Sequence, residues 1–97
     1  LKDHTIYCIS KAGLVALTKS LAKELAPNIR VNGISPGAIT WPNNMDNKTK
    51  ENIINQTILK KKGNAGDIAK TIVFLINDAD YITGQILNVD GGKTLLT

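Results

Sequence analysis

The chain has 97 residues, of which 42% are apolar and 21% are charged, and these proportions are ordinary for a globular protein. They exclude a disordered, collagen-like or disulfide-rich protein, and the single cysteine, Cys8, excludes an internal disulfide. Twelve Lys and Arg residues against eight Asp and Glu give a net charge of +4, too small a balance to indicate a nucleic-acid partner. With one His and one Cys, we also expect no metal site.

The sequence gives no sign of a membrane protein. No apolar run approaches the ~20 residues that a helix needs to cross a bilayer, so we expect no membrane partner. An initiator Met and a charged-then-apolar leader are both missing from the residues given. We therefore expect a cytoplasmic protein, of which these 97 residues are a piece.

The first predicted element is a helix from about Thr5 to Ala26, which Pro27 ends because proline lacks the amide hydrogen that the helix needs. One face of this helix is expected to meet a sheet and carries Tyr7, Lys11, Leu14, Val15, Thr18, Leu21, Ala22 and Leu25. The opposite face is mostly small and carries Ile9, Ala12, Gly13, Ala16 and Ser20. Small side chains let a second helix approach closely, so this face predicts a subunit interface in a homo-oligomer, a dimer or a tetramer.

The remaining predicted elements are a strand, two helices and a second strand, at residues 29–34, 47–59, 64–77 and 84–89. Asn47 is the expected N-cap of the first of these helices, which the lysines at 60–62 are expected to close. Asn64 is the expected N-cap of the second, and Asp67 completes a capping box. The order indicates an α/β protein with a parallel sheet. Because two parallel strands need neighbours, we expect the C-terminal part of a larger, doubly wound domain.

Tyr7 and Lys11 are the strongest candidates for catalytic residues. Their i, i+4 spacing places a phenol and an ammonium on one face of the predicted helix, with Cβ atoms ~5–6 Å apart. A free phenol is a poor acid–base group near neutral pH, and a nearby cation favours its anionic form. The same spacing occurs by chance in many helices, so the pair alone does not establish catalysis.

Three motifs change that judgement: YCISKAG at residues 7–13, NGISPG at 32–37 and DGG at 90–92. In this order and at these spacings they resemble the C-terminal part of the short-chain dehydrogenase/reductase family, and the resemblance covers essentially all 97 residues. It implies a Rossmann-like sheet, with residues 1–97 forming the C-terminal catalytic portion of one domain whose N-terminal cofactor-binding portion is absent. It also implies an NAD(P)-dependent oxidoreductase that acts on a small molecule, with NADP(H) favoured and NAD(H) possible.

The resemblance assigns roles to particular residues. Tyr7 would be the acid–base residue, and Lys11 would assist it while hydrogen-bonding the nicotinamide ribose, so both would contact the cofactor. Pro36 and Gly37 would border the nicotinamide, and Ile39 falls where the family contacts the carboxamide. The family's Gly-rich cofactor loop and its Ser or Asp upstream of the tyrosine would lie before the first residue. We therefore do not expect this chain alone to turn over a substrate.

A narrower resemblance is to the bacterial pteridine reductase branch, carried by PGAITWP at 36–42, GNAGDIA at 63–69 and YITGQILNVDGGK at 81–93. It implies NADPH-dependent reduction of a dihydropterin, whose flat ring Trp41 or Met45 could cover. Lys93 departs from the branch, which often has Arg there. Two alternatives stay open: a reductase of 3-oxoacyl thioesters or other ketones in the same family, and a non-catalytic fragment that serves only in oligomerisation.

Overall fold

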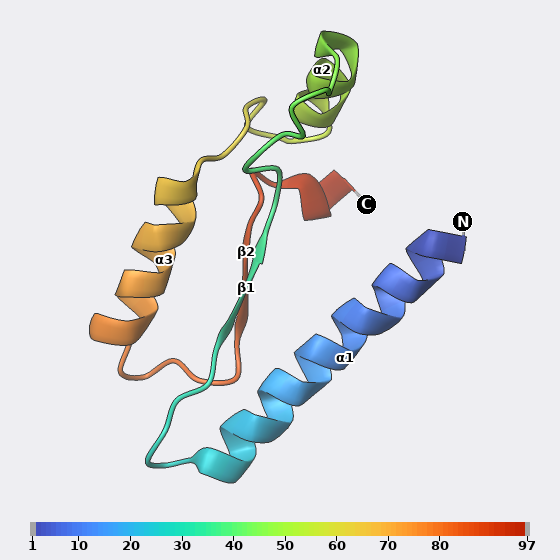
Figure 1. Ribbon diagram of the computed structural model, residues 1–97. Helices are drawn as coiled ribbons and strands as arrows, with labels where there is room; N and C mark the ends of the chain where they lie inside the picture. Colours follow the sequence, from blue (N-terminus) through green and yellow to red (C-terminus); the bar gives the residue numbers. More distant parts are fainter. Residues whose placement is uncertain (1, 97) are drawn as a thin grey trace.

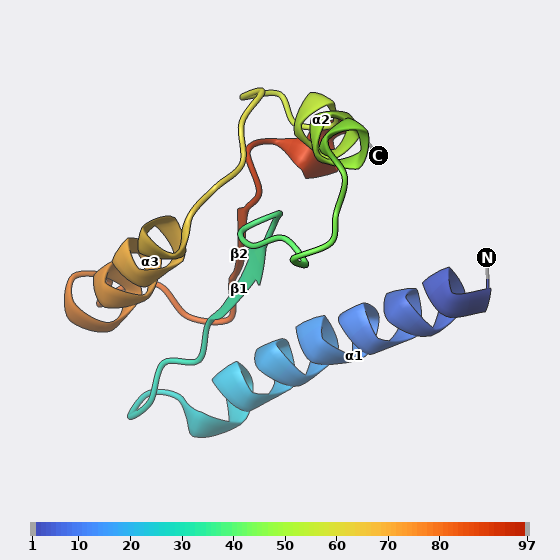
Figure 2. The same cartoon turned by 45° about the horizontal axis from the view of Figure 1, so that its top comes forward.

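The structure, a computed structural model, describes residues 2–96. Its elements are α1 (Lys2–Leu25), β1 (Gly33–Pro36), α2 (Asn47–Asn55), α3 (Ala65–Asn77), β2 (Ile86–Val89) and the short 3-10 helix η1 (Lys93–Leu96). β1 and β2 run parallel and form a two-stranded sheet in which Gly33 pairs with Ile86. α1 and α3 lie on opposite sides of this sheet (Figure 1), and the turned view in Figure 2 shows the same arrangement. The expected α/β architecture with parallel strands is confirmed.

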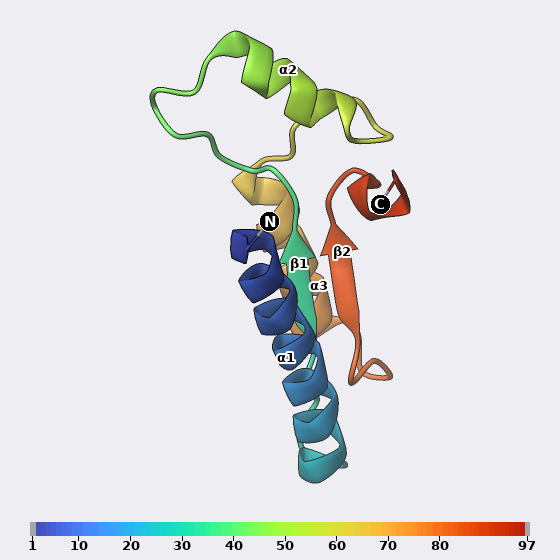
Figure 3. The same ribbon diagram turned by 90° about the vertical axis from the view of Figure 1, so that its right-hand side faces the viewer.

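The carboxyl ends of the two strands point toward α2 and η1 (Figure 3). The long connection that contains α2 leaves from the end of β1, and the C-terminal turn of the chain leaves from the end of β2. In open α/β sheets this is the edge at which ligands bind. The fold therefore directs the search for a site to this edge.

In the half of α1 that runs beside the strands, residues of the face predicted to meet the sheet are buried, as expected. Thr18 and Ala22 are buried, with 6% and 5% of their surface exposed. Tyr7 and Leu14 belong to the same face but are exposed, at 59% and 54%. They are exposed because α1 diverges from the strands toward its N-terminus, as Figure 1 shows.

Both strands begin later than the predicted starts at residues 29 and 84, and the first runs on to residue 36 rather than ending at 34. Before the strands, side-chain bonds interrupt the backbone pairing. Asn32 Nδ2 donates to the carbonyl of Ile82 at 3.0 Å, and Asn32 Oδ1 accepts from the amide of Gln85 at 3.1 Å. The amide of Gly84 still donates to the carbonyl of Val31 at 2.7 Å, but the regular ladder starts only at Gly33 and Ile86.

The predicted boundaries of α2 are wrong at both ends. Its N-cap is Asp46, whose side chain accepts from the amide of Thr49 at 2.8 Å, and Asn47 is the first helical residue. An aspartate suits this position because it satisfies a free amide and places negative charge at the positive end of the helix. The helix ends at Asn55, short of the expected residue 59.

The connection between β1 and α3 is fastened to the rest of the fold by backbone hydrogen bonds. The amide of Gly63 donates to the carbonyl of Ala38 at 3.1 Å, which closes the base of the connection. The carbonyl of Gly91 accepts from the amides of Ile58 and Leu59 at 2.9 and 3.0 Å. These two amides are drawn to the end of β2, so the chain cannot continue α2 to residue 59. One of the lysines at 60–62 does close the helix, because Lys60 Nζ donates to the carbonyl of Asn55, its last residue, at 2.7 Å.

The beginning of α3 agrees with the sequence. Asn64 Oδ1 accepts from the amide of Asp67 at 3.0 Å, and Asp67 Oδ2 accepts from the amide of Asn64 at 2.8 Å. These two bonds form the predicted capping box.

The end of α3 is held by a residue far away in the sequence. The guanidinium of Arg30 donates to the carbonyls at residues 75, 76 and 79, at 2.7, 3.1 and 2.9 Å. Carbonyls at a helix end lack partners within the helix, so a guanidinium both satisfies them and complements the negative end of the helix dipole. This contact ties α3 to the segment before β1.

Few apolar side chains are buried among residues 5–96. Those that are buried are Ala22 and Ala79, while larger apolar side chains on α1 and α3 are exposed, among them Ile6, Ile9, Leu14, Leu17, Ile72, Val73, Phe74 and Ile76. This exposure fits the expectation that the two strands need further neighbours, which stays a prediction. Within the described part of the chain, no helix is both long and apolar enough to cross a membrane.

Candidate active site

The ammonium of Lys11 is anchored at the end of β1. Its Nζ donates a hydrogen bond to the Oγ of Ser35, the third residue of the strand. Ser35 is buried, with 9% of its surface exposed, and Lys11 is half-buried. Tyr7 lies one helical turn earlier on α1 and is 59% exposed, so its side chain is accessible to a ligand. The structure therefore keeps the predicted pair on one helix face and fixes its cationic member against the sheet.

The turn predicted to border the nicotinamide directly follows this anchor. Pro36 ends β1, and the amide of Gly37 donates to the carbonyl of Val89 at 2.9 Å. A Cβ at Gly37 would lie 2.7 Å from the Cα of Asp90, so glycine is needed for the two chain segments to approach this closely. Because Ser35, Pro36 and Gly37 are consecutive, one strand end carries both the lysine anchor and the turn.

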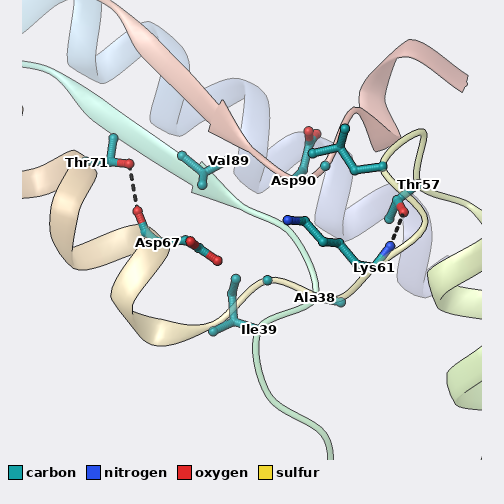
Figure 4. Close-up of a pocket in the computed structure, with 11 residues that line it drawn as sticks. Ala38, Ile39, Thr57, Lys61, Asp67, Thr71, Val89 and Asp90 are labelled. Carbon is teal, nitrogen blue, oxygen red and sulfur yellow. Dashed lines mark hydrogen bonds between the residues drawn. The ribbon is translucent and has the colours of Figure 1, made fainter.

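A cavity of about 320 Å³ opens between α3 and the carboxyl ends of the strands (Figure 4). It is lined by Ala38, Ile39, Thr57, Leu59, Lys61, Gly63, Asp67, Thr71, Val89, Asp90 and Gly91. Among the residues singled out from the sequence for catalysis or ligand binding, only Ile39 lines it. Tyr7 and Lys11 belong to α1, on the other side of the sheet. The structure thus places Lys11 next to the Pro36–Gly37 turn, whereas Ile39 lines a cavity on the other side of the sheet.

Two carboxylates and one ammonium set the charge of this cavity. Asp90 Oδ2 accepts from Thr94 Oγ1 at 2.5 Å, and its Oδ1 accepts from the amide of Gly92 at 2.9 Å. The bond from the Thr94 hydroxyl is the main cause that holds the pKa of Asp90 below its ordinary value of 3.8, against the opposing effect of burial. Asp67 is engaged in the capping box, and the Lys61 side chain reaches into the cavity between the two (Figure 4).

Trp41 and Met45 lie in the loop between β1 and α2, and both are half-buried. Lys62 Nζ lies 5.2 Å from the centroid of the Trp41 ring, a cation–π contact that the sequence did not indicate. The amide of Met45 donates to the carbonyl of Pro42 at 3.1 Å. These contacts hold the loop together, and contact of Trp41 or Met45 with a substrate stays a prediction.

The residues present suit the nicotinamide ribose of a dinucleotide. An ammonium has three donors, and Lys11 gives one to Ser35, which leaves two for ribose hydroxyls. Residues 1–97 contain no Gly-rich phosphate loop, so they supply only this end of a cofactor site. Among the residues that the structure describes, no three His, Cys, Asp or Glu side chains gather as metal ligands would.

Sequence reasoning did not single out Ser35, because strand periodicity alone does not show which face of β1 meets α1. Side chains at i and i+2 of a strand point to the same face. A Cβ at Gly33 would lie 3.7 Å from Oγ1 of Thr18 on α1, so this face of β1 is the one toward α1. Ser35 comes two residues later in the strand and points to the same helix.

A family model described as enoyl-(acyl carrier protein) reductase matches residues 1–94. Curated relatives include 3-oxoacyl-[acyl-carrier-protein] reductases of Thermotoga maritima, 41% identical over 96 residues, and of Buchnera aphidicola, 46% identical over 93 residues. A 7alpha-hydroxysteroid dehydrogenase of Bacteroides fragilis is 42% identical over 98 residues. The three alignments cover 95%, 92% and 96% of this chain and 39%, 38% and 38% of the relatives. The chain therefore spans about two fifths of the length of these relatives.

Solved structures agree with this assignment. A short chain dehydrogenase from Leptospira borgpetersenii, determined with bound NAD+, is 39% identical and superimposes with a TM-score of 0.80. That match covers 92% of this chain and 35% of the other. A short-chain dehydrogenase/reductase from Burkholderia xenovorans is 35% identical with a TM-score of 0.79, covering 92% and 34%.

These matches support the resemblance to the short-chain dehydrogenase/reductase family. They do not support the narrower resemblance to the bacterial pteridine reductase branch. None of the relatives described above is named a pteridine reductase, and two are named reductases of a 3-oxoacyl carbonyl, which favours the carbonyl alternative. The parallel strands, the Tyr7 and Lys11 pair and the match over residues 1–94 agree with one another. The chain belongs to the short-chain dehydrogenase/reductase family.

Proposed function

We propose that the protein containing this chain is an NAD(P)H-dependent reductase of carbonyl groups, with 3-oxoacyl thioesters as its substrate class. The observation that carries this proposal is the Lys11 ammonium anchored at the end of β1, four residues after Tyr7 on the same helix. The names of the relatives at 41% and 46% identity support the substrate class. NADPH is the proposed reductant, and NADH is the alternative because the Leptospira relative was determined with NAD+.

The proposed chemistry assigns a distinct task to each residue. A bound nicotinamide cofactor would supply a hydride to the carbonyl carbon. The Tyr7 phenol donates its proton to the carbonyl oxygen and later regains one from solvent. The Lys11 ammonium stabilises the negative charge that develops on the phenol oxygen and hydrogen-bonds the ribose. Pro36 and Gly37 would border the nicotinamide ring.

The test follows the loss of NADPH near-UV absorbance in the protein that contains this chain, with a 3-oxoacyl thioester and, separately, a dihydropterin. Tyr7→Phe removes the proton donor, so we expect kcat to fall by about 10²–10⁴-fold while the Kd for NADPH stays within about twofold. Tyr81→Phe is the matched control, because Tyr81 is fully exposed and lies between α3 and β2.

Each outcome of this test has a definite meaning. A Tyr7→Phe variant that keeps most of its rate would show that Tyr7 is not the acid–base residue. Tight NADPH binding without turnover of either compound would keep the family and reject both substrate classes. If no cofactor binds at all, the non-catalytic alternative is the correct one.

A second candidate is reduction of a dihydropterin, and the loop after Gly37 supports it. Trp41 and Met45 are half-buried there, and aromatic and thioether groups suit a flat heteroaromatic ring. In the same assay, Trp41→Leu is then expected to raise the KM for the dihydropterin about tenfold and leave the KM for the thioester unchanged. Equal increases in the two KM values would show that Trp41 stabilises the loop and does not contact the dihydropterin specifically.

We also propose that the protein is a homo-oligomer in which the small face of α1 packs against a second copy. Ala12, Gly13 and Ala16 are exposed, and a Cβ at Gly13 would meet no atom within 4 Å in the described residues. A helix surface this flat and open allows a second helix to approach closely.

A further inference from the structure

Ser35 joins two elements that carry different parts of the candidate site. It belongs to β1, where its backbone is paired in register with Asn88, and its hydroxyl is the partner that the structure gives the Lys11 ammonium. The two residues are 24 positions apart in the sequence, and Lys11 belongs to α1. With 9% of its surface exposed, Ser35 is held firmly enough to act as a fixed acceptor.

We propose that Ser35 is a positioning residue, which holds the Lys11 ammonium where it can act on Tyr7 and on the ribose of the cofactor. This inference rests on the proposed function of the Tyr7 and Lys11 pair. A lysine ammonium sits on a flexible four-carbon stem that loses rotamer entropy when it is fixed in one place. Without a partner the ammonium would sample many positions, and its effect on one phenol oxygen would be diluted. Ser35 supplies the partner.

A hydroxyl is chemically suited to this task because it holds the ammonium without cancelling its charge. A carboxylate at the same place would also accept the hydrogen bond, but it would neutralise much of the field that favours a tyrosine anion. The surroundings preserve that field. A cavity of about 140 Å³ lies beside Lys11 and Ser35, between α1 and the strands. Among the described residues that line it, Lys11 alone is charged.

The position of Ser35 also sets the geometry of the site. The residues that directly follow it, Pro36 and Gly37, form the turn proposed to border the nicotinamide. A shift of β1 along its axis would therefore move the Lys11 anchor and this turn together. The ammonium and the turn would keep their relative position, because both are placed by the backbone of residues 35–37. Ser35 itself transfers no proton.

The test compares Ser35→Ala with Ser35→Thr in the protein that contains this chain. Ser35→Ala removes the acceptor, and a lost hydrogen bond to a charged group predicts a fall in kcat/KM of about ten- to hundredfold. The pH profile of alcohol oxidation is expected to move to higher pH, because a displaced ammonium favours the tyrosine anion less. Ser35→Thr keeps a hydroxyl, and the neighbouring cavity has room for its extra methyl group, so both quantities are expected to return to within about threefold of the parent.

Thr49→Ala is the control, since it removes an exposed hydroxyl from α2, outside both the candidate site and the proposed interface, and is expected to change neither quantity. A second measurement does not depend on turnover. The side-chain ¹⁵N–¹H signal of the Lys11 ammonium is visible only while hydrogen bonding slows its exchange, so we expect it in the parent and in Ser35→Thr and not in Ser35→Ala. Thermal unfolding of all variants checks that they fold.

The outcomes separate this inference from the function on which it rests. If Tyr7→Phe abolishes reduction while Ser35→Ala keeps its rate, its pH profile and the Lys11 signal, Ser35 is not a positioning residue. If Tyr7→Phe retains its rate, the proposed function fails, and the Lys11 signal alone decides the role of Ser35: its loss in Ser35→Ala supports anchoring and its persistence overturns it. A lowered rate in Ser35→Ala that Ser35→Thr does not restore would also overturn the inference.

Discussion

The turn after β2 shows how single residues determine local geometry. Gly91 and Gly92 have φ angles of 64° and 87°, a left-handed conformation that side chains with a Cβ rarely adopt. This conformation lets the Asp90 carboxylate bond the amides of Gly92 and Thr94 and the hydroxyl of Thr94. The DGG motif is therefore explained by backbone geometry and by the charge that this geometry holds in place.

A pH-dependent prediction follows for Asp90. Its folded-state pKa is lowered, mainly by the Thr94 hydroxyl, so its contribution to stability is present above pH ~3.8 and is lost as the pH falls through the folded-state pKa. Thr94→Val removes the hydroxyl, so we expect the pKa of Asp90 to rise toward its ordinary value. The cost at neutral pH is at most about 1 kcal/mol, since the group is half-exposed.

The measurement is an NMR titration of the Asp90 carboxyl carbon, with thermal unfolding followed at pH 7 and at pH 2. We expect the parent and Thr94→Val to differ in stability at pH 7, and the difference to shrink as the pH falls through the folded-state pKa of Asp90 and its carboxylate is protonated. Thr40→Val, which alters an exposed threonine elsewhere, is the control. An unchanged Asp90 titration in Thr94→Val would contradict the assigned cause.

At the scale of the elements, the contact between Arg30 and the end of α3 carries a prediction. Arg30→Met keeps an apolar stem but loses three hydrogen bonds to carbonyls in and just after the last turn of the helix. We expect about 2 kcal/mol of lost stability, and faster hydrogen exchange of amides near the C-terminus of α3. Denaturant unfolding and hydrogen exchange measure the two effects.

Arg30→Lys is the informative comparison for this contact. A lysine keeps the charge that complements the helix dipole but lacks the planar fork that reaches several carbonyls at once. We expect it to recover about half of the loss. If Arg30→Met were as stable as the parent, the three bonds would contribute nothing to the docking of α3.

Elements with local signals could be predicted from the sequence, and elements that depend on distant partners could not. The start of α3 was predicted correctly because Asn64 and Asp67 satisfy each other within one turn. The strand boundaries were wrong because Asn32 bonds to residues 50 and 53 positions away, which no local pattern reveals. For the same reason, the helix positions of Tyr7 and Lys11 could be predicted, and the anchoring of Lys11 by Ser35 could not.

At the scale of the whole molecule, the proposed oligomer makes a prediction about mass in solution. Replacing both Gly13 and Ala16 with Leu overfills the small face of α1, and we expect the oligomer to dissociate because overpacking costs about 1–3 kcal/mol. Light scattering of the protein that contains this chain measures the mass. Lys19→Leu adds a leucine to an exposed position outside that face and is expected to leave the mass unchanged. An unchanged mass in the double variant would exclude this interface.

The hydrogen bond between Ala38 and Gly63 closes the connection that carries α2, and it makes this segment an exchangeable cassette. Its ends meet at this bond, and the amides of Ile58 and Leu59 tie it to Gly91, so residues 40–56 can be replaced without breaking these bonds. The entropic cost of a different length is small, about 0.6 kcal/mol for each doubling of a flexible loop. A protein built in this way can change one segment while the contact between Lys11 and Ser35 and the helix position of Tyr7 stay the same.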